Sequence, residues 1–532
     1  MDRFRYLDGQ FDLLVIGGGI IGAGIARDAA RRGLRVGLFE KADFGGGTTA
    51  GSTRLIHGGL RYLAMLDFRL VRMDLRERET LLRIAPHLVK PLEFLVPFYD
   101  RSLWHRAKLR AGMLLYDALS FDKNLPNHRV LGAAETRRAE PHLSPQGLQG
   151  AVAYFDAQVD SPERLCLENL IDAREHGAVV LNYAEVTRAL HAGGSLTGLR
   201  VRDVLGGGET EVNGRLVVNA SGPWFDQVAG RLAPHPHALI RTTKGIHLAA
   251  APVSRQAVAL FSNLDGRLIF VIPWLEYSWI GTTDTDFHGD PSAARATAED
   301  VDYLLGSSRK FFPPAAWGPV YWTNAGVRAL VAQDGRESSV SRAHRIREGP
   351  PGLISVLGGK ITGHRVIAQE ITDLACRRLR VRARCSTSEA PLPGATGAAP
   401  HEAPPGVEAG TLDHLRSLYG SRAAPVLAIA TSHGKWAARL APEYPDIAAQ
   451  VAFAVREEAG ERLTDFLLRR SLLGFSPDQG RKAAPAVARL MADELGWTAA
   501  RQAAELEAYQ TWVEQTQAFR GELRGSRLSY AS

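Results

Sequence analysis

The segment at residues 12–40 constrains the fold of this 532-residue chain more than any other. An apolar run at 13–16 predicts a strand buried on both faces, a helix is expected over about 20–32, and a second strand over 36–39. Between the first strand and the helix stand three glycines with the spacing G-x-G-x-x-G, namely Gly17, Gly19 and Gly22. This order of elements predicts a parallel βαβ unit of the dinucleotide-binding type.

Each glycine of this motif has a physical role in binding a dinucleotide. One permits the tight turn, one lets a pyrophosphate approach the free N–H groups at the helix start, and one lets the helix pack closely on the strand. Glu40 ends the second strand, where a carboxylate accepts hydrogen bonds from ribose hydroxyls. These parts together favour a dinucleotide site over a βαβ unit without a ligand, but they do not choose between NAD and FAD.

Length and composition bound the class of protein. A chain of 532 residues is too long to fold around a single hydrophobic core, so two or three domains are expected. A content of 45% hydrophobic and 23% charged residues is typical of a soluble globular protein. The net charge of +7 fits an anionic substrate or an anionic membrane surface, and no nucleic-acid module occurs, so no nucleic-acid partner is expected. Cys166, Cys376 and Cys385 show neither metal-ligand spacing nor a disulfide framework, which predicts a reducing compartment and no metal.

Two segments bear on the relation to membranes. The apolar run at 13–25 could be mistaken for a signal-peptide core, but the acidic residues before it and its glycine spacing argue against that. We therefore expect a cytoplasmic protein, peripheral on the cytoplasmic membrane. The segment 101–116 mixes apolar and basic residues; a half-buried helix is the favoured interpretation, and a helix lying on an anionic bilayer is the alternative.

A segment rich in small and hydroxylic residues follows the βαβ unit at 45–54 and leads into the sequence LIHGGLRYL at 55–63. Such a segment can wrap an extended cofactor, because its hydroxyl and N–H groups can bond phosphates; the alternative is a flexible surface loop. The apolar residues Leu55, Ile56 and Leu60 interrupt it, which indicates partial burial.

In this position, LIHGGLRYL resembles the FAD-dependent glycerol-3-phosphate dehydrogenases of the aerobic type. Further blocks resemble that family in the same order, at 219–224, 244–247, 270–274, 280–284, 326–328 and 358–362. Several blocks in the right order are more specific than any one of them.

The resemblance implies an α/β flavoprotein with a Rossmann-like FAD domain, an antiparallel-sheet substrate domain and a C-terminal helical domain. The β-branched runs between 245 and 283 are typical of such an antiparallel sheet. The implied boundaries are 1–66, 150–230 and 322–385 for the FAD-binding domain and 67–149 with 231–321 for the substrate-binding domain. A Pro-, Ala- and Gly-rich linker at 386–410 precedes the helical domain at 411–532.

The implied activity is oxidation of sn-glycerol 3-phosphate to dihydroxyacetone phosphate by hydride transfer to flavin N5, with electrons passed to a membrane quinone. One rival is a glycerol-3-phosphate oxidase of the same fold that uses O2. Others are a flavin amino-acid or amine oxidase, and a non-catalytic flavin- or lipid-binding protein. A homodimer is left open.

The implied reaction requires cations for the substrate phosphate and a group that accepts the hydroxyl proton. The substrate-binding residues expected from the resemblance are Arg61, Tyr62, Arg342 and Lys360. His247 is assigned as proton acceptor, and Arg328 is the alternative catalytic residue, holding the developing ketone oxygen. A solvated surface charge for each arginine and a structural core role for His247 are the plainer interpretations.

The cofactor is expected to contact both the βαβ unit and later blocks. Gly358, Gly359 and Lys360 open a helix directly after a strand, and the partial positive charge of that helix start suits a reduced flavin. The expected cofactor-binding residues are Gly17, Gly19, Gly22, Glu40, Thr48, Thr49, Ser52, Leu55, His57, Gly58, Val186, Ala220, Ser221, Gly222, Gly359, Lys360, Ile361 and Thr362.

The chain departs from the family's usual pattern at three places. It has Ser161-Pro162-Glu163 after Val-Asp, Ala329 after Gly-Val-Arg, and Gly363-His364 after Gly-Gly-Lys-Ile-Thr. None of these departures removes a charged residue on which the assignment depends.

Overall fold

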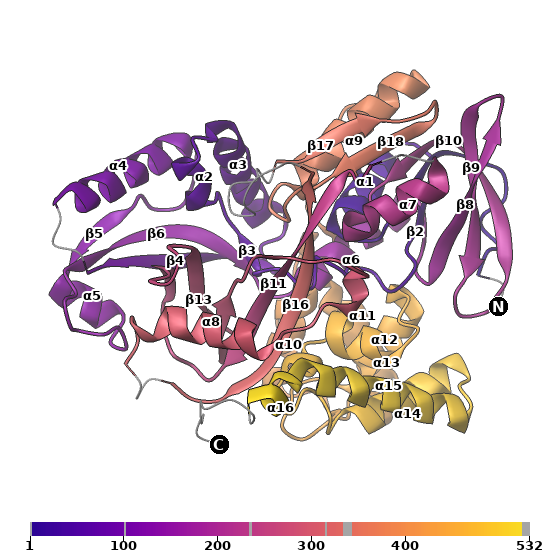
Figure 1. Ribbon diagram of the computed structural model, residues 1–532. Coiled ribbons are helices and arrows are strands. Elements are labelled where there is room, and N and C mark those ends of the chain that lie inside the picture. The colour runs from indigo at the N-terminus through magenta and orange to yellow at the C-terminus, as the bar shows by residue number, and fades with distance from the viewer. Residues whose placement is uncertain (1–2, 100–102, 234–236, 314–316, 333–342, 524–532) are drawn as a thin grey trace.

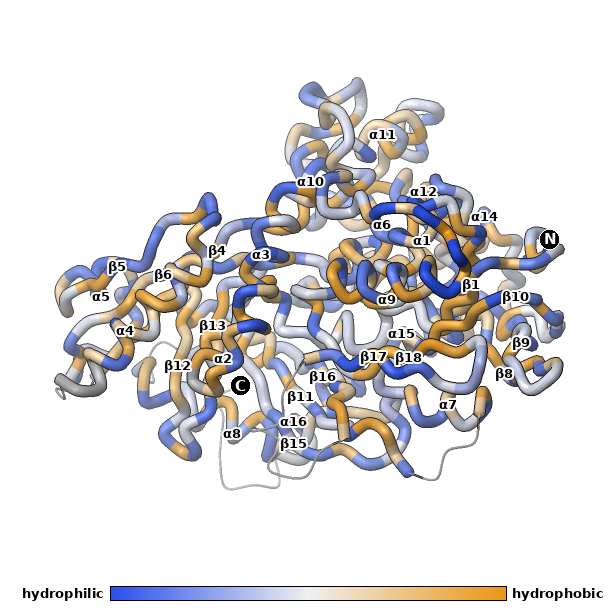
Figure 2. The backbone as a smooth tube through the Cα atoms, turned by 90° about the horizontal axis from the view of Figure 1, so that it is seen from above, coloured by the Kyte–Doolittle hydropathy of each residue, from blue (hydrophilic) through white to orange (hydrophobic). Residues whose placement is uncertain are grey.

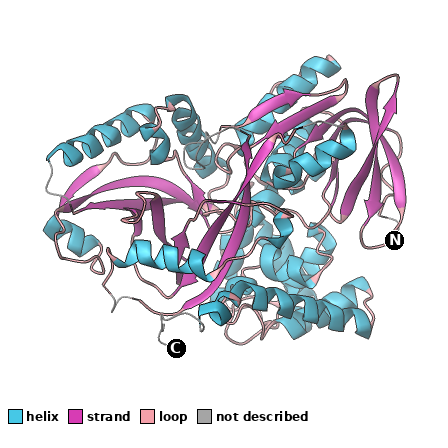
Figure 3. Ribbon diagram, in the orientation of Figure 1, coloured by secondary structure: helices cyan, strands magenta, loops and turns pink. Residues whose placement is uncertain are grey.

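The structure is a computed structural model that describes residues 3–99, 103–233, 237–313, 317–332 and 343–523. Two β-sheets lie side by side, and a group of helices from the C-terminal part of the chain covers one side of both (Figure 1). Helices and strands alternate as far as Leu357, and the elements after it are helical. Figure 3 shows the two sheets with helices packed around them.

The first sheet contains the predicted βαβ unit. Its strand order is β17-β18-β10-β1-β2-β7, with the β8–β9 hairpin attached to β10. The strands are β1 (Gln10–Ile16), β2 (Val36–Phe39), β7 (Val179–Leu181), β8 (Ala184–Ala192), β9 (Ser195–Asp203), β10 (Glu209–Asn219), β17 (Arg345–Glu348) and β18 (Leu353–Leu357). The path β18-β10-β1-β2-β7 is parallel, and β2 and β18 are buried along their whole length, as strands covered on both faces should be.

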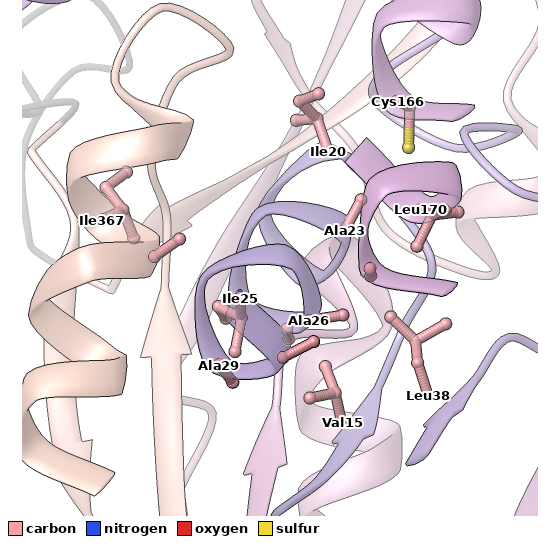
Figure 4. Packing of buried hydrophobic residues seen from close by; sticks show 14 of the residues in the cluster. Val15, Ile20, Ala23, Ile25, Ala26, Ala29, Leu38, Cys166, Leu170 and Ile367 are labelled. Atoms are coloured by element: carbon pink, nitrogen blue, oxygen red, sulfur yellow. The ribbon is translucent and has the colours of Figure 1, made fainter. Parts of the chain in front are cut away.

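Helix α1 (Ile20–Arg31) is the centre of this layer. It packs between α6 (Pro162–Glu175) and α9 (His364–Leu379), and its small residues allow the close approach. A Cβ atom added at Gly24 would lie 3.2 Å from the Cβ of Ala368 in α9. Figure 4 shows Ile25, Ala26 and Ala29 of α1 in one cluster with Val15, Leu170 and Ile367.

The predicted antiparallel sheet is the second sheet, in which β4 and β12 nevertheless pair in parallel. Its order is β15-β11-β14-β13-β12-β4-β6-β3, with β16 beside β11 and β5 beside β6. The strands are β3 (Leu55–Ile56), β4 (Val89–Phe98), β5 (Arg129–Gly132), β6 (Gly150–Val159), β11 (Ile240–Ala250), β12 (Ala257–Phe261), β13 (Leu268–Trp274), β14 (Tyr277–Gly281), β15 (Thr285–Asp286) and β16 (Val320–Val331). Hydrophobic residues follow its inner strands, as at β12 in Figure 2.

The remaining helices cover the sheets and build the C-terminal part. Those of the first 400 residues are α2 (Leu60–Ala64), α3 (Phe68–Ile84), α4 (Leu103–Leu119), α5 (Ala133–Ala139), α7 (Phe225–Leu232) and α8 (Ala298–Arg309). Those that follow are α10 (Ala409–Tyr419), α11 (Ala423–Ser432), α12 (Ala448–Glu458), α13 (Leu463–Asp465), α14 (Ala484–Leu495), α15 (Ala499–Gln517) and α16 (Phe519–Leu523). The later group has its own apolar core, around Leu415, Phe453 and Val487. Within the described residues, no helix combines the length and the apolar character that crossing a bilayer requires.

Strand pairing differs from the predicted domain boundaries at two long strands. β6 and β16 fall in ranges assigned to the FAD domain, yet both belong to the second sheet. β6 pairs with β4 over its whole length, and β16 pairs with β11 from Val331 to Val320. These pairings join residues far apart in sequence, so local patterns did not reveal them. The predicted linker also makes specific contacts, because Leu392 N–H donates to the Ile84 carbonyl (2.8 Å) and Gly394 N–H to Glu168 (2.6 Å).

Candidate active site

A cavity of about 680 Å³ lies where the two sheets meet. Gly17 and Gly19 after β1, Ser221 after β10, and Gly359 and Lys360 after β18 line one wall, so the carboxyl ends of three parallel strands open into it. The opposite wall comes from β16 of the second sheet. The predicted dinucleotide motif therefore shares one cavity with residues of the other sheet.

The glycine turn fits the close approach that the motif predicts. Gly17 has φ of +109°, and a Cβ atom there would lie 2.6 Å from the Ala220 carbonyl oxygen. A Cβ atom at Gly22 would lie 1.9 Å from the Gly17 carbonyl oxygen. Gly17 thus faces the cavity, whereas Gly22 supports the turn from behind and allows α1 to begin directly beneath it.

The carboxylate of Glu40 lines the cavity and holds two loops together. Its oxygens accept hydrogen bonds from the N–H groups of Gly18 (2.7 Å) and Ala42 (2.9 Å). Burial raises the pKa of Glu40 despite these bonds. Glu40 therefore shapes the glycine turn, and its predicted bond to a ribose remains a prediction.

The hydroxyl-rich segment bridges the two sheets and is not a flexible surface loop. Thr49 Oγ1 accepts from the Ile20 N–H (3.1 Å) at the start of α1, and Thr48 Oγ1 donates to the Val327 carbonyl of β16 (2.5 Å). Further along, the His57 N–H donates to Thr362 Oγ1 (3.2 Å), next to the start of α9. The segment thus passes along the cavity from the glycine turn to the second predicted helix start.

Arg328 reaches the cavity from the middle of β16. Gly326, two residues earlier, lies within this continuous strand, where the lack of a side chain admits the backbone of Gly51. The Arg328 guanidinium donates to Thr282 Oγ1 (2.8 Å), the Thr283 carbonyl (3.1 Å) and the Asp284 carboxylate (3.3 Å). These three bonds fix the cation at the cavity wall.

Lys360 is the second cation of the cavity wall. Its ammonium forms an ion pair with Asp74 of α3 and lies 4.2 Å from the centre of the Tyr62 ring. Burial raises the pKa of Asp74 to about 6, even though Lys360 favours the ionised form. Tyr62 lines the same cavity, so this predicted substrate residue lies beside Lys360.

His247 is buried behind the cavity wall. Its ring stacks on Trp279 with 5.1 Å between ring centres, and its Nε2 is 2.9 Å from Thr53 Oγ1. Burial, and then Arg328 and Arg54, hold the pKa of His247 well below its usual value of 6.5, so the ring is neutral at neutral pH. Among the described residues that line the cavity, Thr53 is present and His247 is not. His247 therefore communicates with the cavity through the Thr53 hydroxyl.

Most other predicted cofactor residues face this space. Ser52, Leu55, His57, Val186, Ala220, Gly222, Ile361 and Thr362 line the cavity. Gly58 lies in the layer behind it, where a Cβ atom would come 2.6 Å from the Tyr116 hydroxyl. Arg61 belongs to α2, but its side chain is outside the described part of the structure, and Arg342 lies outside the described residues altogether.

Sequence reasoning missed three residues that complete this site. Asp74 pairs with Lys360, Thr282 holds Arg328, and Thr53 connects His247 to the cavity. Thr53 lies in the hydroxyl-rich segment, where it could have been singled out. Asp74 is one acid in an arginine- and glutamate-rich helix, and nothing local distinguishes it from its neighbours.

Comparison with known proteins decides the family. A family model described as FAD dependent oxidoreductase matches residues 12–374, and one described as the C-terminal domain of alpha-glycerophosphate oxidase matches residues 385–502. A glycerol-3-phosphate dehydrogenase of Synechocystis sp. is 39% identical, with 95% of this chain and 96% of the relative aligned. The chain belongs to the FAD-dependent glycerol-3-phosphate dehydrogenase family.

Two further relatives agree with this membership. The aerobic glycerol-3-phosphate dehydrogenase of Staphylococcus haemolyticus is 34% identical, with 93% of this chain and 92% of the relative aligned. The crystal structure of the Bacillus halodurans glycerol-3-phosphate dehydrogenase complexed with FAD matches with a TM-score of 0.79 at 29% identity, covering 99% of this chain and 98% of that one. The predicted fold class and the FAD cofactor are thereby confirmed.

The residues present fit an FAD molecule. One end of the cavity carries the glycine turn, Glu40 and Val186, which suit the adenosine and pyrophosphate, and the other carries Thr362 at the start of α9, which suits an isoalloxazine ring. A Cβ atom at Gly17 would collide with the Ala220 carbonyl, so only glycine fits at this turn on the cavity wall.

Proposed function

We propose that this enzyme oxidises sn-glycerol 3-phosphate to dihydroxyacetone phosphate in glycerol metabolism and passes the electrons to a membrane quinone. The observation that carries the proposal is the pair of cations, Arg328 and Lys360, in the cavity that also holds the dinucleotide motif. Family membership supports the same reaction, because the curated relatives are glycerol-3-phosphate dehydrogenases.

The two cations suit a substrate with a phosphate dianion. Arg328 offers a planar fork that can bind two oxygens at once, and Lys360 offers a compact charge beside the Tyr62 ring. Both side chains are held by acids, Asp284 and Asp74, so neither must be ordered when the substrate arrives. We assign substrate binding to Tyr62 and Lys360, and we retain Arg61 and Arg342 as predicted members of the same site.

Oxidation of the alcohol also requires removal of its hydroxyl proton. We propose that Thr53 Oγ1 receives this proton while passing its own to His247 Nε2, since the two atoms are 2.9 Å apart. His247 is neutral, so its ring has a free acceptor nitrogen, but burial, Arg328 and Arg54 oppose its charged form, so it can hold the proton only in passing. Arg328 is the alternative catalytic group, because a fixed guanidinium can stabilise the oxygen as it becomes a ketone.

When bound, FAD supplies the acceptor for the hydride that leaves the carbinol carbon. The wall from Gly359 to Thr362 then favours the reduced state, because the start of α9 carries partial positive charge and Lys360 carries a full one. The two electrons leave to a quinone in the dehydrogenase proposal, or to O2 in the oxidase alternative, which the match to an oxidase C-terminal domain keeps open.

Peripheral attachment to an anionic membrane is part of this proposal. Helices α2, α3 and α4 lie side by side at one end of the molecule (Figure 1). Leu114 is 62% exposed and Phe121 79% exposed, and the basic residues Lys108 and Arg110 are exposed on α4. Exposed apolar side chains beside basic ones suit insertion at an anionic lipid interface.

The decisive experiment follows bleaching of the bound flavin without oxygen. We expect sn-glycerol 3-phosphate to reduce the flavin and amino acids to leave it oxidised; reduction by amino acids would favour the amino-acid oxidase. No bleaching by either substrate would point to a non-catalytic binding protein. Turnover with a quinone analogue, compared with oxygen uptake, then separates dehydrogenase from oxidase.

A further inference from the structure

The C-terminal helices reach into the cavity that binds the cofactor. Arg462, Thr464, Arg469 and Trp512 line it, together with Asp43 and Gly46 from the loop after β2. This loop is tied to the glycine turn, because the Gly45 N–H donates to the Gly18 carbonyl (2.9 Å). The C-terminal helices therefore border the dinucleotide end of the cavity.

Two neighbouring arginines connect these helices to the loop. Arg469 and Arg470 lie in a π-helical turn at Phe466–Arg470, and both bind the carboxylate of Asp43. In a regular α-helix, adjacent side chains point about 100° apart, whereas in this π-helical turn the side chains of Arg469 and Arg470 both reach the carboxylate of Asp43. Asp43 is fully buried, and although burial opposes its ionisation, Arg470 and Arg469 hold its pKa at about 2.

Two of the three guanidinium nitrogens of Arg469 donate hydrogen bonds to acids within the described part of the chain. Nε donates to Asp43 and Nη2 to Asp465 (2.8 Å), while Nη1 makes no hydrogen bond to any described residue. The side chain is 12% exposed and lines the cavity. A dinucleotide brings two phosphate charges to an end of the cavity where Glu40 and Asp43 already stand, so a cation there has a clear electrostatic role.

We propose that the C-terminal helical part completes the FAD site: Arg469 supplies a cation to the dinucleotide end of the cavity and, with Arg470, holds the Asp43 loop against the glycine turn. This inference depends on FAD binding and not on the identity of the substrate, so it stands or falls separately from the proposed reaction. It makes Arg469 a cofactor-binding residue that lies outside every motif recognised in the sequence.

A second buried ion pair gives a matched control. Arg164 of α6 donates to Glu458 of α12 (2.6 Å), and both side chains are fully buried. This pair also joins the C-terminal helices to the first layer, but neither residue is among the described residues that line the cavity. Breaking it tests the structural cost of losing a buried ion pair without removing a cation from the cofactor site.

The experiment compares Arg469→Met and Arg469→Lys with Arg164→Met and Arg164→Lys in the full chain. Each protein is stripped of FAD, and the FAD dissociation constant is measured from the quenching of flavin fluorescence at several salt concentrations. We expect Arg469→Met to weaken FAD binding by about tenfold or more and to reduce its dependence on salt, because one charge-assisted contact is lost. Arg469→Lys should recover part of the affinity, while Arg164→Met should lower the unfolding temperature with the dissociation constant unchanged.

Wild-type affinity and salt dependence in Arg469→Met, with only a lower unfolding temperature, would overturn the inference. An equal loss of FAD affinity in Arg164→Met would overturn it as well, since the effect would then be structural. If a methionine variant does not fold, the lysine pair decides: the inference requires weaker FAD binding in Arg469→Lys and unchanged binding in Arg164→Lys.

Discussion

Replacing Arg328 by methionine tests the substrate site most directly. The change removes the guanidinium from the cavity wall and keeps a side chain of similar length on β16. In the proposed site this cation binds the substrate phosphate or the developing ketone oxygen. We expect slower flavin reduction by sn-glycerol 3-phosphate, while FAD remains bound because the dinucleotide end of the cavity is unchanged.

The size of the effect follows from the contacts that Arg328 can make. A hydrogen bond to a charged group contributes about 1.5–3 kcal/mol, and about 1.4 kcal/mol corresponds to a factor of ten. The loss of one such contact should therefore lower kcat/KM by about ten- to a hundredfold. The carboxylate of Asp284, 5% exposed, also loses this cation and repels an anionic substrate, which places the expected value at the upper end.

Arg267→Met is the matched control for this experiment. Arg267 donates to the Asp284 carbonyl (2.7 Å), so it supports the same loop, but it is not among the described residues that line the cavity. Stopped-flow bleaching without oxygen gives the rate constant for flavin reduction, and thermal unfolding reports the structural cost. Wild-type reduction kinetics in Arg328→Met, or equal losses in both variants, would refute the assignment.

Four further changes probe the remaining groups. Lys360→Met should raise the KM for sn-glycerol 3-phosphate about tenfold or more in steady-state assays, because a charge-assisted contact is lost; an unchanged KM would contradict its role. Thr53→Val should slow flavin reduction about tenfold and Thr53→Ser should restore it if the hydroxyl passes the proton to His247; no difference between the two would contradict the relay. Burial raises the pKa of Asp74 from its ordinary 3.8 to about 6 in the folded protein, so the free energy of unfolding should fall by about 2 kcal/mol as the pH rises from 4 to 6. Asp74→Asn should flatten that slope in pH-dependent denaturation. Leu114→Ser should reduce sedimentation with anionic vesicles and leave kcat unchanged; equal sedimentation of both proteins with anionic vesicles would argue against the proposed surface.

The sequence predicted the structure where the physical constraint acts between residues that are close together in the chain. The strand, glycine turn and helix of residues 10–31 were predictable because the apolar periodicity and the steric demands at Gly17 and Gly22 lie within a few residues. A helix after β18 was predictable for the same reason, although α9 begins at His364, four residues beyond the point where the sequence placed its opening glycines and lysine.

Local sequence patterns could not predict contacts between segments that are far apart in the chain. The 12-residue strand β16 belongs to the second sheet because it pairs with β11, about 80 residues earlier, and no local pattern reveals this. The partner of Lys360 is likewise Asp74, which lies 286 positions away. Two of the predicted cations, Arg328 and Lys360, line one cavity, and the structure identifies the acids that hold them.

These acids change how the site must be understood. Arg328 and Lys360 are each fixed by a carboxylate from another part of the fold, so their positions are set before any substrate binds. Fixed charges stabilise a developing charge more than mobile ones do, because no reorganisation is needed during the reaction. The same carboxylates offset part of the attraction for anions, so binding of a phosphate depends on the directed hydrogen bonds of the cations as well as on their charge. A site of this kind selects a substrate by geometry as well as by charge, with Arg328 directed from β16 and Lys360 from the loop after β18.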